Sequence, residues 1–431
     1  MSKACQVISA IQDFYQSSHQ QDLWVGFSGG LDSTVLLDAL VRLKPNDVNL
    51  NAIHIHHGLQ ADADRWLVHC KQQAEDLQVN FIAKQVVIKL NQNLEAAARQ
   101  ARYQAFNELV GEQGVLLTAH HQRDQAETFI LNLMRGAGLA GLAAMPTKRL
   151  LNSKSKQAWL YRPLLNIGYS HLVDYAHQHG LSWVEDPMNQ QLDFRRNYVR
   201  HQLLPLFDST WSQAQQKISQ AASHCFESNQ LLEQLAQLDL KSIDHSASYL
   251  DWQALQNLDW ARQKNSLRYW FHNHHSVRLT QTDLDWFKSE CFSASSNANP
   301  QRIIAGKELR RFKRFVFYPV EKIEEINICW SGGIDLSRVG STFQASLGEG
   351  IAHDWFNANN KVEIRTLKSV DVPNRTSLKK WFQQQEIPPW QRPYWPVVTI
   401  NNQLAAIRDY RVFEPFNVKS NEIGAIFVAL N

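Results

Sequence analysis

The stretch Phe27-Ser28-Gly29-Gly30-Leu31-Asp32-Ser33-Thr34 decides the fold class, because it joins an apolar, strand-like run to a helix-like run. Its two glycines allow a tight turn that brings backbone amides against an anion, and the start of the following helix favours negative charge. Ser28 and Ser33 add hydroxyl donors. The stretch therefore predicts a phosphate-binding loop, although no Gly-Lys-Ser/Thr closes it as in a Walker loop. An acid at position 32 suggests a divalent cation bridging to phosphate; the alternative is a plain turn with Asp32 as a helix cap.

Outward from this loop, strand-like and helix-like stretches alternate through the first 150 residues. The apolar runs are residues 23–27, 48–54, 81–88 and 115–119, and the amphipathic stretches that follow them are residues 33–43, 62–77, 94–110 and 124–134. Parallel strands need a crossover between them, so this alternation predicts an α/β domain with a mainly parallel sheet flanked by helices. Ligands in such sheets bind at the carboxyl ends of the strands.

In the rest of the chain, the pattern of apolar residues changes twice. From about Trp211 to Glu290, apolar residues recur at helical spacing, which predicts a helical domain, and residues 293–300 read as a loop. The short strand-like runs at residues 315–320, 362–366, 397–400 and 424–430 predict a small β-rich C-terminal domain. The predicted division is a catalytic domain over residues 1–205, a mainly helical domain over 206–320 and an α+β domain over 321–431.

Composition excludes several classes of protein. The 431 residues carry 44 Lys+Arg against 41 Asp+Glu, a net charge of +3, so any nucleic-acid-binding surface must be local. The five cysteines are dispersed without a Cys-x-x-Cys pair, which disfavours disulfides, zinc ribbons and iron–sulfur clusters. Because no apolar run has the length of a signal peptide or a membrane span, we expect a cytoplasmic protein without a membrane partner.

Acidic and basic pairs at helical spacing mark the other candidate site residues. Asp124 and Glu127 stand three residues apart where a helix follows a strand, so they share one helix face. They could hold a cationic amine, take its proton or bind magnesium; the alternative is an acidic first turn that complements the helix dipole. Arginines at similar spacing could bind phosphates or a carboxylate, or be solvated surface charges: Arg99, Arg102, Arg196 and Arg200.

Two stretches of the C-terminal half are locally basic. Residues 301–320 hold six basic residues against one acid, interleaved with three phenylalanines, and they include Arg310, Arg311 and Lys313. Basic groups neutralise phosphates and aromatic rings stack on unpaired bases, although a solvated strand with a buried phenylalanine face explains the same pattern. Residues 365–380 form the second basic stretch, which ends in Lys379 and Lys380.

Four further blocks carry a resemblance to a known family. The loop at residues 28–33 resembles that of the PP-loop ATPases, which adenylate a carbonyl oxygen and let a nucleophile displace AMP. The blocks at residues 53–59, 94–103, 118–128 and 183–200 resemble, in order and spacing, those of the tRNA(Ile)-lysidine synthetases. The resemblance covers roughly residues 20–205 and recurs near residues 378–390.

This resemblance implies a two-step reaction. ATP, with Mg²⁺, adenylates the C2 oxygen of the wobble cytidine in tRNA(Ile) with a CAU anticodon, and the side-chain amine of free L-lysine then expels AMP. It implies a catalytic set of Asp32, Asp124, Glu127 and Arg196, with Asp32 as a magnesium ligand. The implied ATP-binding residues are Ser28, Gly29, Gly30, Leu31, Asp32, Ser33, His57 and Arg102. It also implies that Lys379 and Lys380 bind tRNA, beside the candidates Arg310, Arg311 and Lys313.

One residue departs from the family pattern. Many relatives have an acid where this chain has Arg123, a change that either weakens a cation site or points harmlessly outward. Two alternatives to the main hypothesis stay open: another PP-loop enzyme that modifies tRNA, or a relative that binds tRNA without catalysis.

Overall fold

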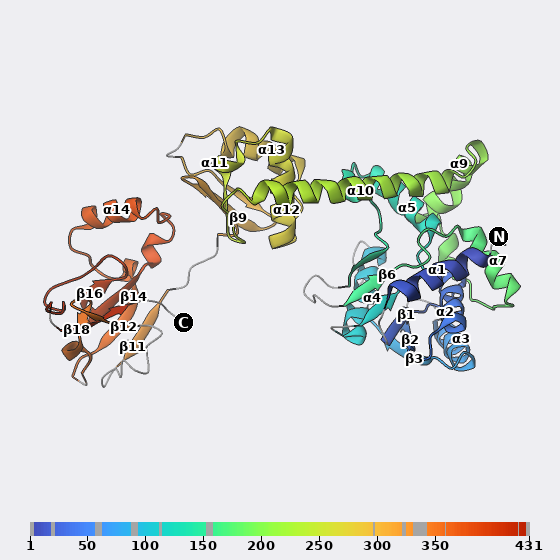
Figure 1. The fold of residues 1–431 in the computed structure, drawn as a ribbon, viewed down its shortest axis with the longest axis horizontal. Helices are drawn as coiled ribbons and strands as arrows, with labels where there is room; N and C mark the ends of the chain where they lie inside the picture. The colour runs from blue at the N-terminus through green and yellow to red at the C-terminus, as the bar shows by residue number, and fades with distance from the viewer. Residues whose placement is uncertain are drawn as a thin grey trace. The chain divides into compact units, whose positions relative to one another are not determined.

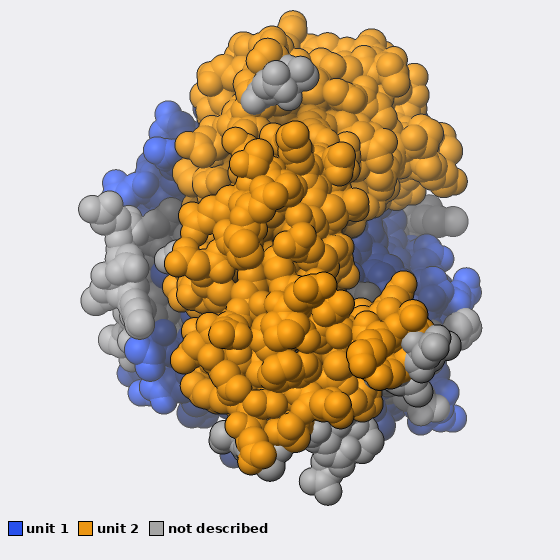
Figure 2. All heavy atoms as spheres, turned by 90° about the vertical axis from the view of Figure 1, so that its left-hand side faces the viewer, with its two compact units in different colours: residues 1–234 blue, residues 235–431 orange. Residues whose placement is uncertain are grey.

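A computed structural model describes residues 4–18, 22–56, 63–87, 94–111, 114–151, 158–295, 298–320, 325–330, 343–357, 359–420 and 422–427. The chain divides into two compact units, residues 1–234 and 235–431, which Figure 2 draws in blue and orange. Among the described residues, no helix combines the length and the apolar character that crossing a membrane requires.

Unit 1 is built on a mainly parallel sheet with the strand order β3-β2-β1-β4-β6-β5 (Figure 1). Its strands are β1 (Asp22–Gly26), β2 (Asn49–His56), β3 (Asn80–Gln85), β4 (Val115–Leu117), β5 (Lys148–Leu150) and β6 (Trp159–Tyr161). Only the pairing of β5 with β6 is antiparallel among these strands. The predicted parallel sheet is confirmed, and each of the four predicted strand runs overlaps an observed strand.

Helices cover both faces of this sheet. The first core joins strand β1 to three helices, α1 (Ala4–Ser17), α2 (Leu31–Leu43) and α7 (Tyr169–Gln178), through residues such as Ile11, Val25, Leu36 and Tyr175. On the other face, Phe106 and Val110 of α4 (Leu94–Val110) pack against Leu116 and Leu160 of the sheet. Helix α3 (Ala63–Asp76) connects β2 to β3.

The strand order locates the binding edge. The chain leaves β1 toward β2 and β3 and then returns to place β4 on the opposite side of β1, so the strand order reverses between β1 and β4. Ligands of open α/β sheets bind at such a reversal, beyond the carboxyl ends of the strands. The segments after β1 and β4 are therefore the ones that should form the site.

The remainder of unit 1 is helical. After α5 (Gln122–Leu133) and α6 (Leu139–Leu142), the chain forms α8 (Arg195–Tyr198), a π-helical turn (Val199–Leu203) and α9 (Leu204–Thr210). The long helix α10 (Ala214–Leu240) follows and continues past residue 234 into unit 2. Val199 and Leu204 pack against Ala126 and Ile130 of α5, so the segment near residue 200 is held against the helix that follows β4.

Unit 2 begins with helices that pack on a small antiparallel sheet. The helices are α11 (Trp252–Leu255), α12 (Trp260–His275) and α13 (Gln281–Trp286), and the sheet has the order β7-β10-β9-β8. Its strands are β7 (Tyr249–Asp251), β8 (Gln301–Ile304), β9 (Lys307–Phe312) and β10 (Phe315–Phe317). The sequence grouped the strand-like run 315–320 with those of the C-terminal domain, although the predicted division left it in the domain over 206–320; in the structure, β10 pairs with β7, which lies among the helices. A three-residue strand such as β7 has too short a pattern to be recognised in sequence.

The C-terminal part of unit 2 contains two further sheets. One has the order β11-β14-β15-β16-β17 and the other β12-β18-β13. Their strands are β11 (Asn327–Trp330), β12 (Phe343–Leu347), β13 (Ile351–Ala352), β14 (Val362–Thr366), β15 (Pro396–Ile400), β16 (Gln403–Ile407), β17 (Arg411–Val412) and β18 (Ile423–Phe427). Helix α14 (Arg375–Gln384) interrupts them, and the β-rich character predicted for this part is confirmed. The division of the chain at residues 205 and 320 stays a prediction.

Candidate active site

The loop after β1 is shaped for close approach of an anion. Gly29 has a φ of +78°, and a Cβ there would lie 2.6 Å from the Sγ of Cys70, so conformation and space both require glycine. Ser28 donates its N–H to the Oγ of Ser33 at 3.2 Å, and the Ser33 hydroxyl donates to the carbonyl of Gly30 at 3.0 Å. Gly30 begins helix α2 without a side-chain cap, so the first-turn amides, which have no acceptor within the helix, suit a phosphate.

Asp32 stands in the first turn of α2 and faces the segment after β4. Its Oδ2 lies 3.5 Å from Nε2 of His121, and its Oδ1 is buried without a hydrogen-bond partner in the described structure. An orphaned carboxylate oxygen beside a phosphate loop fits a magnesium ligand. Among the described residues, no cluster of three metal-binding side chains occurs, which is compatible with Mg²⁺ because this ion is usually held by one or two carboxylates and the substrate phosphates.

The segment after β4 carries His121, which is fully buried at the start of α5. Its Nδ1 accepts the backbone N–H of Arg123 at 3.3 Å, and Asp124 Oδ2 accepts the backbone N–H of His121 at 3.0 Å, which makes a reciprocal capping box. Burial lowers the pKa of His121, but the carboxylates of Asp124 and Asp32 outweigh burial and raise it. This geometry gives His121 a structural role as the cap of α5 and places it between Asp32 and Asp124.

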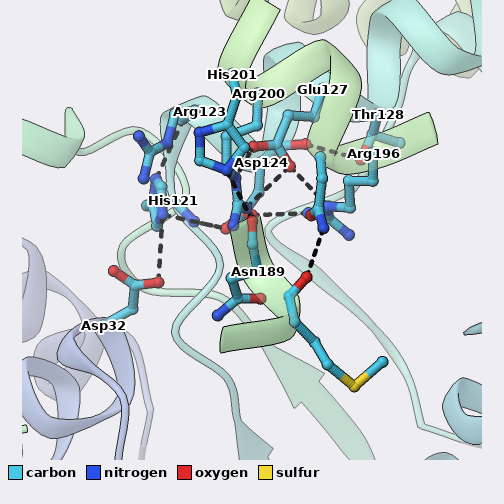
Figure 3. A network of polar contacts seen from close by, with 12 residues as sticks. Asp32, His121, Arg123, Asp124, Glu127, Thr128, Asn189, Arg196, Arg200 and His201 are labelled. Carbon is cyan, nitrogen blue, oxygen red and sulfur yellow. Dashed lines mark hydrogen bonds and ion pairs between the residues drawn. The ribbon is translucent and has the colours of Figure 1, made fainter. Parts of the chain in front are cut away.

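Asp124 and Glu127 each bind both of the arginines at residues 196 and 200 (Figure 3). Arg196 donates from Nε to Glu127 at 2.6 Å and from a terminal nitrogen to Asp124 at 2.7 Å. Arg200 donates from Nε to Glu127 at 2.6 Å and from a terminal nitrogen to Asp124 at 3.3 Å. The Glu127 side chain is fully buried and that of Asp124 is 10% exposed, so we call these four residues the buried charge network.

Neighbouring positive charges keep Asp124 ionised. Burial alone would raise the pKa of Asp124, but the positive charges of His121 and Arg196 lower it far below its usual value. For Arg200, the carboxylate of Glu127 outweighs burial and raises the pKa. Asp124 and Arg200 are therefore charged at neutral pH, and a carboxylate with a lowered pKa is a weak base.

Arg123, the residue that departs from the family pattern, lies beside this network and stacks on an aromatic ring. Its guanidinium carbon lies 3.7 Å from the ring centroid of Tyr169, at the start of α7, and that ring is also 5.4 Å from the imidazole of His121. Tyr169 therefore holds the guanidinium of Arg123, and both alternatives considered for this arginine stay predictions.

Two further arginines also lie at this edge of the sheet: Arg200, which the sequence named as a candidate but did not place in the catalytic set, and Arg162, which it did not name. Arg200 carries half of the buried charge network, and its four-residue spacing from Arg196 was the available signal. Arg162 follows β6, is 1% exposed and donates to the carbonyl of Pro146 at 2.7 Å. Arg102 and Arg162 lie close enough to help lower the pKa of His120, although burial is the larger cause. His57 lies outside the described residues.

The predicted tRNA-binding residues lie in unit 2 and differ in exposure. Lys379 and Lys380 are exposed on α14, and Arg310 is half-buried on β9. Lys313 lies 3.0 Å from a carboxylate oxygen of Glu386. Arg311 is fully buried and donates to four backbone carbonyls, those of Cys291, Ala294, Ser295 and Ala298. Since its nitrogens serve the fold, the geometry argues against a contact of Arg311 with RNA.

A glycine loop without a Walker lysine, at the strand reversal of a parallel sheet and beside a buried charge network, defines a nucleotide-binding domain of the PP-loop class. Family models agree: the PP-loop domain matches residues 4–207, the TilS substrate binding domain residues 250–317, and the TilS substrate C-terminal domain residues 366–428. The chain belongs to the tRNA(Ile)-lysidine synthase family.

Three relatives support this membership. The tRNA(Ile)-lysidine synthase of Hydrogenovibrio crunogenus is 36% identical, with 95% of this chain and 98% of the relative aligned. Those of Coxiella burnetii and Proteus mirabilis are 36% and 35% identical, with 93% and 94% of this chain and 91% and 94% of the relatives aligned.

Proposed function

We propose that this chain ligates free L-lysine to C2 of the wobble cytidine in tRNA(Ile) with a CAU anticodon and converts ATP to AMP and pyrophosphate. The observation that carries the proposal is the continuity of the site. His121 lies between Asp32 of the phosphate loop and Asp124 of the buried charge network, at 3.5 Å from a carboxylate oxygen of each. The residues proposed for adenylation and those proposed to bind lysine for attack by its amine therefore lie close together, after the neighbouring strands β1 and β4.

The phosphate loop supports the first half-reaction. The first-turn amides of α2 and the hydroxyls of Ser28 and Ser33 suit the phosphates of ATP. Asp32 Oδ1 would hold Mg²⁺ together with those phosphates, and the bound ion would neutralise the charge that develops when pyrophosphate leaves. Asp32 thus connects binding of the nucleotide to the histidine that caps α5.

The buried charge network supports binding of lysine. The α-amino and α-carboxylate groups of an amino acid are of opposite charge, and the network offers carboxylates for the first and guanidinium forks for the second. Asp124 and Glu127 already pair with Arg196 and Arg200. Bound lysine would replace some of these ion pairs with ion pairs of its own amino and carboxylate groups, so no charge would be left uncompensated. The lowered pKa of Asp124 suits this acid to holding a cation better than to taking a proton.

The direct test incubates the purified protein with ATP, magnesium, radiolabelled lysine and an unmodified tRNA(Ile) transcript. We expect covalent attachment of lysine to the tRNA and release of pyrophosphate. Absence of attachment, while a relative such as the Hydrogenovibrio crunogenus synthase succeeds in parallel, would refute the proposal. An inactive relative would bind the tRNA and leave ATP intact.

Asp32→Ala separates the two half-reactions from tRNA binding. We expect pyrophosphate release to fall at least ~10³-fold, since removal of one transition-state charge contact typically costs 10²–10³ and this variant also removes a magnesium ligand. The dissociation constant for tRNA should change less than twofold. Retained pyrophosphate release would show that the loop acts without this acid.

A further inference from the structure

One face of the sheet β7-β10-β9-β8 carries aromatic side chains that the hydrophobic core does not use. In β10, Val316 is buried in the core, whereas Phe315 and Phe317 on either side of it point to the opposite face and are half-buried. Tyr249 pairs with Phe317 across the sheet, and Phe312 pairs with Phe315. The ring centroids of Tyr249 and Phe315 lie 5.0 Å apart, so these side chains form one aromatic surface.

Residues of the C-terminal part border this surface and leave a hollow beside it. The hollow has a volume of about 330 Å³, and we call it the aromatic pocket; its apolar lining includes Tyr249, Phe312, Phe315, Phe317, Pro388 and Trp395. Trp390 meets two of the lining rings edge-on, with centroid distances of 6.0 Å to Phe312 and 5.5 Å to Phe317. Aromatic rings from both the sheet and the C-terminal part therefore line the pocket, and Trp390 supports two of them.

Cationic side chains lie beside the aromatic rings of this pocket. The guanidinium of Arg310 lies 5.2 Å from the ring centroid of Trp390, and that of Arg392 lies 6.0 Å from the centroid of Phe312. Lys313 lines the pocket beside Glu386. These cations would add nothing to the binding of an apolar small molecule, whereas RNA has flat bases that stack on rings and phosphates that pair with cations.

We propose that the aromatic pocket binds one unpaired nucleobase of the tRNA by stacking, an assignment that rests on the proposed function. Stacking on aromatic rings is the usual way in which proteins hold single-stranded bases, and it needs no particular base because every base has a flat face. A volume at the lower end of the ~300–1,000 Å³ typical of ligand pockets suits one base better than a run of bases. This stacking is distinct from the phosphate binding proposed for Lys379 and Lys380.

The test replaces one wall of the pocket and measures lysine transfer and tRNA binding separately. We expect Phe317→Leu to raise both the KM and the dissociation constant for tRNA about tenfold, with kcat within twofold of wild type. The dependence of binding on salt should not change, because the variant keeps every group that neutralises a phosphate. Phe317→Trp should restore affinity, and Trp260→Leu, which alters a half-buried tryptophan outside the pocket, should leave it unchanged.

The outcomes separate the pocket from the proposed function. If wild type binds tRNA without transferring lysine, the function fails and the dissociation constants still test the pocket. If transfer is normal and neither Phe317→Leu nor Phe315→Leu, each shown by its thermal melt to be folded, changes KM or the dissociation constant, the pocket proposal is overturned. Dissociation of an oligomer in these variants, with unchanged tRNA affinity, would assign the pocket to a second copy of the chain and also overturn it.

A tRNA transcript without its last four nucleotides identifies the source of the base. Loss of the Phe317→Leu effect with this transcript would place a base of the 3′ end in the pocket. Persistence of the effect would place a loop base there.

Discussion

The acid–arginine pairs of the two units use the same residue types in different surroundings. In unit 1, the Glu127 side chain is fully buried, and Arg196 and Arg200 are 24% and 19% exposed. In unit 2, Arg310 and Glu308 are 30% and 31% exposed at 2.9 Å. Exposed pairs contribute ~0–1 kcal/mol to stability, whereas breaking a buried pair by removing one partner costs ~3–5 kcal/mol. Burial, more than the presence of a pair, therefore marks the charges that organise the site.

Glu127→Gln tests this comparison most directly. The substitution keeps the shape of the side chain but leaves Arg196 and Arg200 with Asp124 as the remaining acid of the network. We expect the free energy of unfolding, measured in urea, to fall by ~3–5 kcal/mol. Lysine transfer should fall at least ~10²-fold, because the variant lacks a carboxylate proposed to bind the substrate.

Glu308→Gln is the matched control. It removes the acid from the half-buried Arg310 pair, which is more exposed than the Glu127 pairs, and should change the free energy of unfolding by less than ~1 kcal/mol. Similar losses in both variants would mean that burial does not distinguish the two pairs.

His121 gives the buried site a dependence on pH. The pKa of His121 is raised above its unfolded value by the carboxylates of Asp124 and Asp32, and this outweighs the hydrogen bond from the Arg123 N–H that protonation of Nδ1 gives up. The protonated form therefore stabilises the fold fully below about pH 6.5, and this contribution is lost as pH rises through the folded-state pKa. We expect His121→Asn, which retains a capping side chain, to remove a contribution on the order of 1 kcal/mol at pH 6.

The measurement is urea unfolding of both proteins from pH 5.5 to 8.5. The difference in stability between wild type and His121→Asn should shrink as pH rises. A difference that is constant, or that grows with pH, would show that the charge of His121 does not stabilise this site.

Much of this architecture could be predicted from the sequence, because the relevant signals are local. The glycine loop, the helix over residues 94–110 and the strand over residues 362–366 appear where the pattern placed them. For Arg200, the sequence could name the residue as a candidate but not its partners, since Asp124 and Glu127 are more than 70 residues away in the chain. Arg311 shows the reverse case, because a basic stretch gives no sign that one of its arginines is turned into the fold.

Exposed lysines and a buried arginine of unit 2 should differ in their effect on tRNA binding. Lys379→Gln and Lys380→Gln together should weaken tRNA binding several-fold and reduce the slope of log affinity against log salt by about 2, one for each phosphate that is no longer neutralised. Arg311→Gln should lower stability without changing that slope, since its guanidinium serves backbone carbonyls. Titration of labelled tRNA at several salt concentrations measures both slopes. An unchanged slope in the lysine variant would remove α14 from the proposed interface.

The smallest effect expected is that of Arg123, whose charge lies next to the buried network but is held by an aromatic ring. A cation on an aromatic ring contributes ~0.5–2 kcal/mol depending on its desolvation, and here the Arg123 guanidinium carbon is 3.7 Å from the centroid of Tyr169. A double-mutant cycle with Arg123→Gln and Tyr169→Leu should therefore give a coupling free energy of ~0.5–2 kcal/mol in urea unfolding. Lysine transfer should remain within several-fold of wild type in Arg123→Gln. A coupling near zero together with a large loss of transfer would instead assign this arginine to the reaction, and would mean that the departure from the family pattern changed the site itself.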